Sequence, residues 1–170
     1  EGSRFQSSAD DTTPPGKPTI LKWEALYGGA RFFYTIPPDE DLLSVNAEYT
    51  NDKGKTFYFT SSFYTDSLDV VGLGSTDPKV IKLYSVDRAG NRSETVNVEI
   101  VPYESSINRV AKTLSVKSGF SSFLVDWENE LEQLINVYIS FKYTQDGQLR
   151  DLVSVFSSNE MKERRFIEDL

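Results

Sequence analysis

The 170-residue sequence contains no cysteine and no histidine. Without cysteine, the chain can form no disulfide bond and offers no thiol nucleophile or thiolate metal ligand. Without histidine, it lacks the side chain that most often serves as a general base or as a transition-metal ligand. It also has no apolar run near the roughly 20 residues that a membrane-spanning helix needs. These absences exclude every catalytic arrangement or metal site that depends on cysteine or histidine.

Positive charge is scarce as well, since 26 acidic residues stand against 18 basic ones and give a net charge of −8. Such a chain repels phosphate backbones and anionic membrane surfaces, so nucleic acid is not an expected partner. Apolar residues make up 38% of the sequence and aromatic residues 13%. This content is enough for a packed core and argues against a disordered chain.

The polarity pattern divides the chain into a lead-in and a series of strands. Residues 1–18 are polar and contain three of the seven prolines, which is typical of a flexible tether. Beyond residue 18, short segments alternate apolar and polar side chains and are separated by Gly, Pro, Asn and Asp. Strands are predicted at residues 19–26, 30–36, 42–50, 55–60, 66–71, 79–86 and 94–101. Seven short strands without a helical period predict an antiparallel β-sandwich over residues 19–103.

The same alternation predicts which side chains form the core of this sandwich. The expected inward set is Ala30, Phe32, Tyr34 and Ile36 in the second strand, Leu43, Val45, Ala47 and Tyr49 in the third, Leu83 in the sixth, and Val96, Val98 and Ile100 in the seventh.

The pattern then starts again about 90 residues further on, which is the spacing of tandem sandwich modules. Residues 28–62 can be laid over residues 119–158, so that Val45 falls on Val137 and Gly54 on Gly147. We therefore place a boundary near residues 103–108 and a second module at 109–170. This module is truncated, because it ends after the counterpart of the fifth strand.

The end of the second module has two interpretations. In the first, residues 158–170 hold the counterpart of the fifth strand. In the second, they form a C-terminal helix that begins with a capping box of Ser157 and Glu160. In either case the strand at 135–143 lacks the neighbour that the counterpart of the sixth strand would provide. We expect the natural chain to continue past Leu170, another copy to cover this edge, or the tail to fold back over it.

Two segments of the first module resemble fibronectin-III-like modules of bacteria. These are the lead-in DTTPPGKP at 11–18 and the segment VDRAGNRSE at 86–94. The resemblance implies tandem fibronectin-III/Ig-like sandwiches, the second incomplete. One departure is that Lys79 and Ile81 stand where a tyrosine is usual, so the tyrosine-corner hydrogen bond is expected to be missing.

A narrower resemblance extends over residues 11–170. The segments PPDEDLLSVNAEY, SSFYTDSLDVVGLG, LYSVDRAGNRSETVNVEIVP and FLVDWEN are similar to a family of Bacteroidetes surface lipoproteins. In that family, two such modules precede a discoidin-like galactose-binding domain, and the genes accompany starch-utilisation-like glycan uptake systems. The resemblance implies a lipidated cysteine upstream of Glu1, a location on the outer-membrane surface and a third domain beyond Leu170.

Acidic loops at one end of the first module are a weak candidate for a Ca²⁺ site. In this topology the lead-in and the loops after strands two and six share one end, which gathers Asp11, Asp39, Asp41 and Asp87. Carboxylate oxygens suit Ca²⁺. Such acidic loops more often form a solvated surface without a bound ion, so we expect no metal requirement.

Aromatic side chains are candidates for a sugar-binding surface. Tyr58 and Tyr84 alternate out of phase with the core and are expected on one exposed sheet face, while Phe63 and Tyr64 lie in a loop. Exposed rings can stack on sugars, although they can equally pack across strands or cover a module junction.

Catalysis is not expected, because the sequence has no G-x-S-x-G, P-loop, H-E-x-x-H or G-x-G-x-x-G motif. No cofactor is expected either. The predicted function is a non-catalytic spacer and assembly scaffold in glycan capture and uptake at the cell surface. The alternative is direct carbohydrate binding through the exposed aromatic residues.

Overall fold

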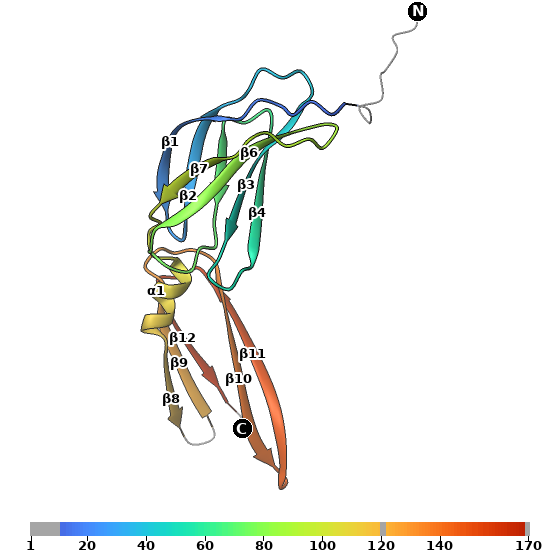
Figure 1. Cartoon of the computed structure of the whole chain (residues 1–170). Coiled ribbons are helices and arrows are strands. Elements are labelled where there is room, and N and C mark those ends of the chain that lie inside the picture. Colours follow the sequence, from blue (N-terminus) through green and yellow to red (C-terminus); the bar gives the residue numbers. More distant parts are fainter. Residues whose placement is uncertain (1–10, 120–121, 169–170) are drawn as a thin grey trace, which may run out of the picture. The chain divides into compact units, whose positions relative to one another are not determined.

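The computed structural model describes residues 11–119 and 122–168 and divides the chain into two compact units (Figure 1). Unit 1 is Glu1–Tyr103 and unit 2 is Glu104–Leu170. Residues 1–10 of the expected tether lie outside the described residues. Residues 11–18 belong to no helix or strand, yet Pro15 and Pro18 are buried. The second half of the lead-in is therefore packed against unit 1.

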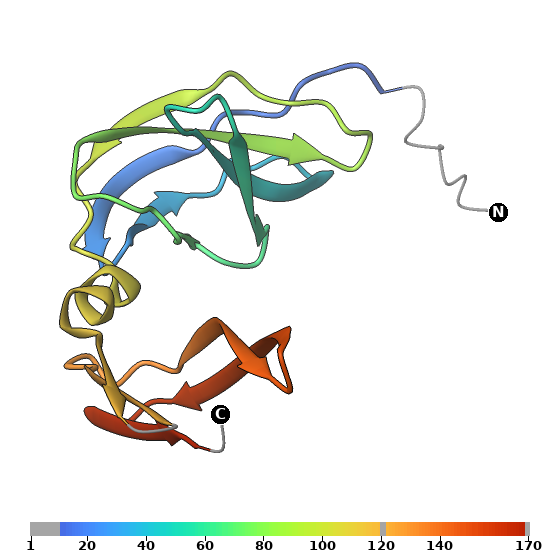
Figure 2. The same cartoon turned by 90° about the horizontal axis from the view of Figure 1, so that it is seen from below.

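Unit 1 is a sandwich of two antiparallel sheets (Figure 2). One sheet has the order β1-β2-β5 and consists of β1 (Thr19–Leu26), β2 (Gly29–Thr35) and β5 (Ser67–Val70). The other has the order β4-β3-β6-β7 and consists of β3 (Leu42–Thr50), β4 (Thr56–Ser62), β6 (Lys79–Asp87) and β7 (Val96–Ile100). Three strands facing four in this order, with the fourth strand paired to the third, form a fibronectin-III-like sandwich. The predicted all-β fold class is confirmed.

The core of unit 1 lies between these sheets and follows the predicted alternation. Its fully buried members include Ala30, Phe32, Tyr34, Val45, Ala47, Ile81, Leu83 and Ile100. Ile36, Tyr49 and Val98 are partly buried and pack against this cluster. Val96 is half-buried. In β7, Ile100 at the end of the strand is therefore fully buried, whereas Val96 at its start is only partly buried.

The start of β3 departs from the prediction. Leu43, expected inside, is 49% exposed, and Leu42 is buried instead. The reason is a shift in the pairing of β3 with β6 between Leu42 and Ser44. A bulge of this kind adds one residue to a strand and reverses the facing of the side chains before it.

Lys79, which stands where a tyrosine was expected, forms hydrogen bonds to the loop before β6. Its side chain is buried at the start of β6, and its Nζ donates hydrogen bonds to Ser75 Oγ at 2.7 Å and to the backbone oxygen of Asp77 at 3.1 Å. The start of the sixth strand is therefore tied back to the preceding loop by an ammonium group instead of a phenol. Although the tyrosine-corner hydrogen bond is absent, the start of β6 is still bonded to the preceding loop through Lys79.

A short parallel bridge between Tyr27 and Tyr103 joins the residue after β1 to the last residue of unit 1. Gly28 N donates to Tyr103 O at 2.7 Å, and Tyr103 N donates to Leu26 O at 3.0 Å. The two tyrosine rings lie side by side with their centroids 5.7 Å apart. The bridge connects the end of β1 to the segment that follows β7.

Unit 2 begins with a short helix and continues with five strands. These are α1 (Ser106–Thr113), β8 (Ser115–Gly119), β9 (Ser122–Glu128), β10 (Ile135–Gln145), β11 (Gln148–Ser158) and β12 (Lys162–Ile167). One sheet has the order β12-β9-β8, and β10 and β11 form a separate two-stranded sheet. These sheets correspond to β5-β2-β1 and to β3-β4 of unit 1. Of the described strands, only β11 pairs with β10.

Two features of unit 2 correct the sequence-based expectations. Helix α1 was not predicted; it begins at the N-cap Ser105, whose side chain accepts a hydrogen bond from Asn108 N. The alternative C-terminal helix is wrong, because Lys162–Ile167 is a strand paired with β9. Ile167 is buried in the core together with Trp127, which favours a strand over a solvated helix. None of the described helices is long and apolar enough to cross a membrane.

β10 and β11 are joined by a two-residue turn. Asp146 and Gly147 both have positive φ, at 52° and 72°, and they alone separate the paired residues Gln145 and Gln148. Such a two-residue turn matches the natural twist of the strands it joins. Gly147 corresponds to Gly54, which also has a positive φ of 77°.

Candidate functional site

Three of the four aspartates proposed as calcium ligands come together at one end of unit 1. Asp11, Asp41 and Asp87 each place a carboxylate oxygen within 4.8 Å of the others. Asp39 does not join them; its carboxylate accepts a hydrogen bond from Gly16 N at 3.0 Å. We call the first three residues the three-aspartate cluster.

The buried member of this cluster is already bonded within the protein. Both carboxylate oxygens of Asp87 accept hydrogen bonds at 2.8 Å from Asn91, one from its backbone N–H and one from its side-chain amide. Burial alone would raise the pKa of Asp87, but these bonds and those from the turn backbone hold the pKa below its ordinary value.

The same network ties the lead-in to two loops. Asn91 Nδ2 also donates to the backbone oxygen of Asp11 at 2.9 Å, and Arg88 N donates to the backbone oxygen of Asp41 at 2.9 Å. These bonds hold the lead-in and the two loops together without any ion. A Ca²⁺ ion takes six to eight oxygen ligands, and three carboxylates, one of them engaged, are a poor fit.

Tyr84 lies on the predicted sheet face but is not exposed as expected. Only 4% of it is accessible, because the guanidinium of Arg92 covers its ring at 3.7 Å from the centroid. Arg92 is held there by an ion pair with Glu48 at 3.1 Å. The ring of Tyr84 is thus occupied by a cation and cannot also stack on a sugar in this conformation.

Tyr58 and Tyr64 are the candidate aromatic residues that solvent reaches. Tyr58 is 67% exposed on β4, directly opposite Glu48 of β3. Tyr64 is more exposed still and lies against Phe63, with ring centroids 3.9 Å apart. Unit 1 therefore presents one exposed ring on a sheet face and another in the segment after β4.

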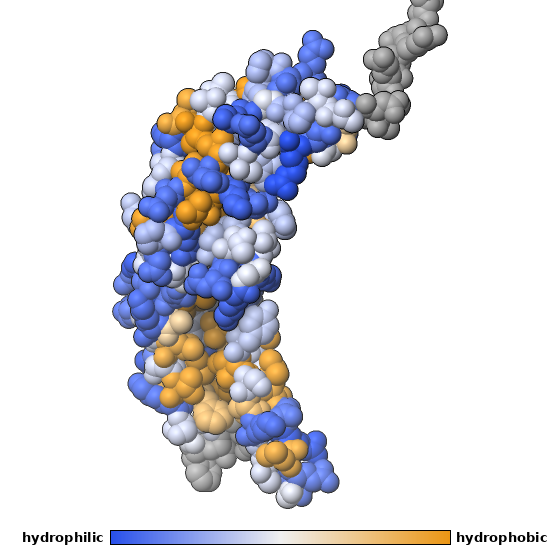
Figure 3. Space-filling model, in the orientation of Figure 1, coloured by the Kyte–Doolittle hydropathy of each residue, from blue (hydrophilic) through white to orange (hydrophobic). Residues whose placement is uncertain are grey.

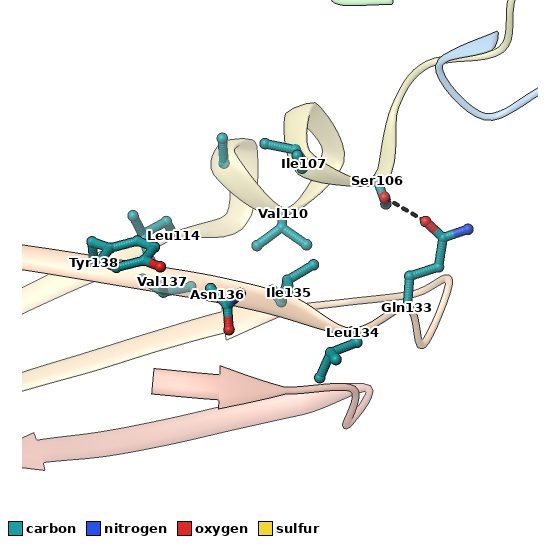
Figure 4. A pocket seen from close by; sticks show the side chains of 11 residues that line it. Ser106, Ile107, Val110, Leu114, Gln133, Leu134, Ile135, Asn136, Val137 and Tyr138 are labelled. Atoms are coloured by element: carbon teal, nitrogen blue, oxygen red, sulfur yellow. Dashed lines mark hydrogen bonds between the residues drawn. The ribbon is translucent and has the colours of Figure 1, made fainter. Parts of the chain in front are cut away.

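An apolar groove lies in unit 2, between α1 and β10 (Figure 4). Its volume is about 610 Å³, and it is lined by Ser106, Ile107, Val110, Ala111, Leu114 and residues 133–138. Val110 points from α1 toward Ile135 of β10 (Figure 4). No acidic or basic side chain lines it.

The sequence did contain a signal for this groove. Ile107, Val110, Ala111 and Leu114 follow the spacing i, i+3, i+4, i+7 of an apolar helix face. The helix was not predicted, because residues 106–113 straddle the expected boundary at 103–108 and the start of the second module, where only strands were expected.

Apolar side chains are also exposed on the outer face of the β10–β11 hairpin. Tyr138 is 68% exposed, and its neighbours Val153 and Val155 on β11 are exposed as well. Figure 3 shows apolar side chains gathered over unit 2. The equivalent face of unit 1 carries polar pairs instead, such as Asn46 opposite Thr60.

The other carboxyl groups with a shifted pKa belong to sheet surfaces. Asp69 of β5 forms a two-pronged ion pair with Arg31 of β2, at 2.6 and 2.7 Å, and the hydrogen bond from Arg31 lowers the pKa of Asp69. A hydrogen bond from Ser158 likewise lowers the pKa of Glu163. Both acids are therefore stabilised in their charged form.

Comparison with solved structures finds similar chains of low sequence identity. A two-fibronectin-type-III segment of chicken tenascin is 13% identical, with a TM-score of 0.45, over 91% of this chain and 83% of that chain. The chicken interferon gamma receptor alpha chain is 11% identical, with a TM-score of 0.41, over 91% of this chain and 82% of that chain. These scores are too low to add to the fold assignment, which rests on the strand order.

Comparison with protein families gives a specific match. No curated protein matches the chain. A family does match residues 15–102, which cover the strands of unit 1 and more than half of the 170 residues. The chain belongs to the family described as "Domain of unknown function (DUF4959)".

Proposed function

We propose that the chain is a non-catalytic spacer and assembly module that works in glycan capture and uptake at the outer cell surface. The observation that carries the non-catalytic part is the direction of the pKa shifts. Every described carboxyl group with a resolved shift has a lowered pKa, namely Asp69, Asp87 and Glu163. A carboxyl that acts as a general acid near neutral pH needs the opposite, a pKa raised by burial or by a neighbouring negative charge.

The groove in unit 2 supports the same proposal. Glycoside hydrolysis requires two carboxyls about 5–10 Å apart on either side of a bound sugar. The 610 Å³ groove between α1 and β10 has no carboxyl among its lining residues. It is suited to apolar contact with another polypeptide rather than to acid–base chemistry.

The packing of the lead-in favours a spacer. The hydrogen bond from Asn91 to the backbone oxygen of Asp11 and the burial of Pro18 fix residues 11–18 against the rest of unit 1. A segment fixed in this way sets the direction in which unit 1 leaves its attachment point. The surface location, the lipid anchor and the link to glycan uptake are drawn from the resemblance to Bacteroidetes surface lipoproteins.

The experiment measures glycan binding and hydrolysis with the 170-residue chain. The chain is incubated with a panel of soluble polysaccharides, and the reducing ends that are released are quantified. The same polysaccharides are then cast into native gels. We expect no release of reducing ends and no retardation of the chain. Hydrolysis that survives repurification would refute the non-catalytic role, and retardation by a glycan would favour the second candidate.

The second candidate is direct carbohydrate binding by unit 1, favoured by the exposed ring of Tyr58 beside Glu48. If it holds, Tyr58→Ala abolishes retardation, because the loss of a stacking ring removes most of the sugar contact. Tyr64→Ala is the matched control, since it removes an even more exposed tyrosine from outside the sheet face. Equal loss in both variants would argue against a platform on the sheet face.

A further inference from the structure

Lys79 is a buried cation that has no anionic partner in the part of the chain that the structure describes. The residue is only 8% exposed at the start of β6. Its Nζ donates to two neutral oxygens, Ser75 Oγ and the backbone oxygen of Asp77. None of the ion pairs among the described residues includes it. Buried charges are usually paired, because a charge removed from water loses its solvation. The ammonium group therefore lacks the anion that would normally accompany it.

Two small hollows open beside Lys79, between the turn that follows β3 and the segment that precedes β6. Their volumes are about 320 and 230 Å³. Both are lined by Tyr49, Asp52, Ser75 and Lys79, and the larger one also by Asn51. We call these five residues the Lys79 pocket. Sites for small molecules span about 300–1,000 Å³, so this pocket suits one compact chemical group rather than a large ligand.

The side chains of the Lys79 pocket supply hydrogen-bond donors that have no acceptor. An ammonium group has three N–H bonds, and Lys79 uses two of them. Ser75 Oγ accepts from Lys79, which leaves its hydroxyl hydrogen available. Asn51 Oδ1 accepts two backbone hydrogen bonds within its own turn, at 3.0 and 2.9 Å, so its amide nitrogen is left for another partner. Neither this nitrogen nor the Tyr49 hydroxyl forms a hydrogen bond to the described residues.

We propose that the Lys79 pocket binds a carboxylate group. A carboxylate carries the charge that Lys79 lacks, and its two oxygens accept up to about four hydrogen bonds. The available donors of Lys79, Ser75, Asn51 and Tyr49 match this capacity. The carboxylate belongs either to a small organic acid or to the C-terminus of a peptide. This binding site is independent of the spacer role proposed above.

Two acids beside the pocket limit the charge of its ligand. Asp52 lines both hollows, and Asp77 lines the smaller one. Both residues are exposed, so water screens their charges, whereas Lys79 is buried. The repulsion that remains grows in proportion to the charge of the ligand. A singly charged carboxylate is therefore favoured over a doubly charged phosphate or sulfate.

The first test is a titration of the isotopically labelled 170-residue chain, followed in NMR spectra at constant ionic strength. The probes are acetate, N-acetylalanine as a mimic of a peptide C-terminus, its uncharged amide, and inorganic phosphate. We expect both carboxylates to cause saturable shifts in the backbone signals of residues 49–52 and 72–79. Tighter binding of N-acetylalanine than of acetate identifies a peptide as the source, and any other order identifies a small acid. No saturable shift with either carboxylate, or binding of the amide or of phosphate that is equally tight, overturns the proposal.

The second test compares variants in the same titration. Lys79→Met keeps the apolar stem and should weaken carboxylate binding about tenfold or more, because a hydrogen bond to a charged group is lost. Lys82→Met is the matched control, since it removes the same charge from the same strand but from its exposed face. Ser75→Ala removes an exposed hydroxyl, so it tests the pocket even if Lys79→Met does not fold. Affinity that is unchanged in Ser75→Ala, or that falls as much in Lys82→Met as in Lys79→Met, overturns the proposal.

Discussion

Leu83 lies at the centre of unit 1 and provides a direct measure of its core. It is fully buried in β6, where it pairs with Ala47 of β3 and Val96 of β7. Leu83→Ala removes three carbon atoms, worth about 2.4 kcal/mol at roughly 0.8 kcal/mol for each buried carbon. The cavity that remains adds to this cost, and measured Leu→Ala changes in cores span about 2–5 kcal/mol. We expect a loss of about 3 kcal/mol in the free energy of unfolding of unit 1.

The assay is differential scanning calorimetry of the wild type and two variants. For a domain of this size, a loss of 1 kcal/mol lowers the melting temperature by about 4–8 °C, so Leu83→Ala should lower it by about 12–24 °C. The control is Lys82→Ala, whose exposed side chain faces away from the core and makes one surface ion pair with Glu48. That change should cost less than about 1 kcal/mol. Equal shifts for the two variants would refute the assigned facing of β6.

Three further outcomes follow from other parts of the structure. Melting temperatures in excess EDTA and in millimolar Ca²⁺ should coincide, because Asp87 is already satisfied by Asn91; a site at 100 times its Kd would add about 2.7 kcal/mol and raise the midpoint. Asp69 and Asp87 have lowered pKa values, so the stability they contribute is present at neutral pH and is lost as the pH falls below about 4. Urea unfolding from pH 7 to pH 3 should show this loss, and Asp69→Asn should flatten it; a pH profile unchanged by that substitution contradicts the role of the Arg31 pair. Gly147→Ala should destabilise unit 2 by about 1–2 kcal/mol because of the positive φ, and a neutral effect in urea unfolding would contradict the turn type.

Most strands could be predicted because each has one face in the core and one in solvent, which produces a period of two. The bulge at Leu42 could not, since it depends on the pairing of β3 with β6 rather than on the polarity of β3 itself. Helix α1 has a clear apolar face, yet it is short and lies across the expected boundary between two modules made of strands. The C-terminal segment had a helical cap pattern, and pairing with β9 outweighed it.

The positions of the acidic loops could be predicted from the topology, but the individual side-chain contacts could not. Topology alone indicates that Asp11, Asp41 and Asp87 share one end of the sandwich, and the structure brings them together. The position of Asp39 depends on one contact with the lead-in, which no local pattern encodes. The covering of Tyr84 depends on Arg92, a residue eight positions away that lies beyond the end of β6.

The parallel bridge at Tyr103 has a mechanical consequence for the spacer role that we propose. The chain enters unit 1 along β1 and leaves it at Tyr103, and the two segments run in the same direction where they meet. A pull on both ends of the unit therefore draws them past each other along their length. The hydrogen bonds from Gly28 and Tyr103 then carry the load together, whereas the bonds of a hairpin pulled open at its ends break one after another. Tension along the chain therefore loads this bridge in shear, in addition to the contacts of the lead-in and the pairs of β1 with β2.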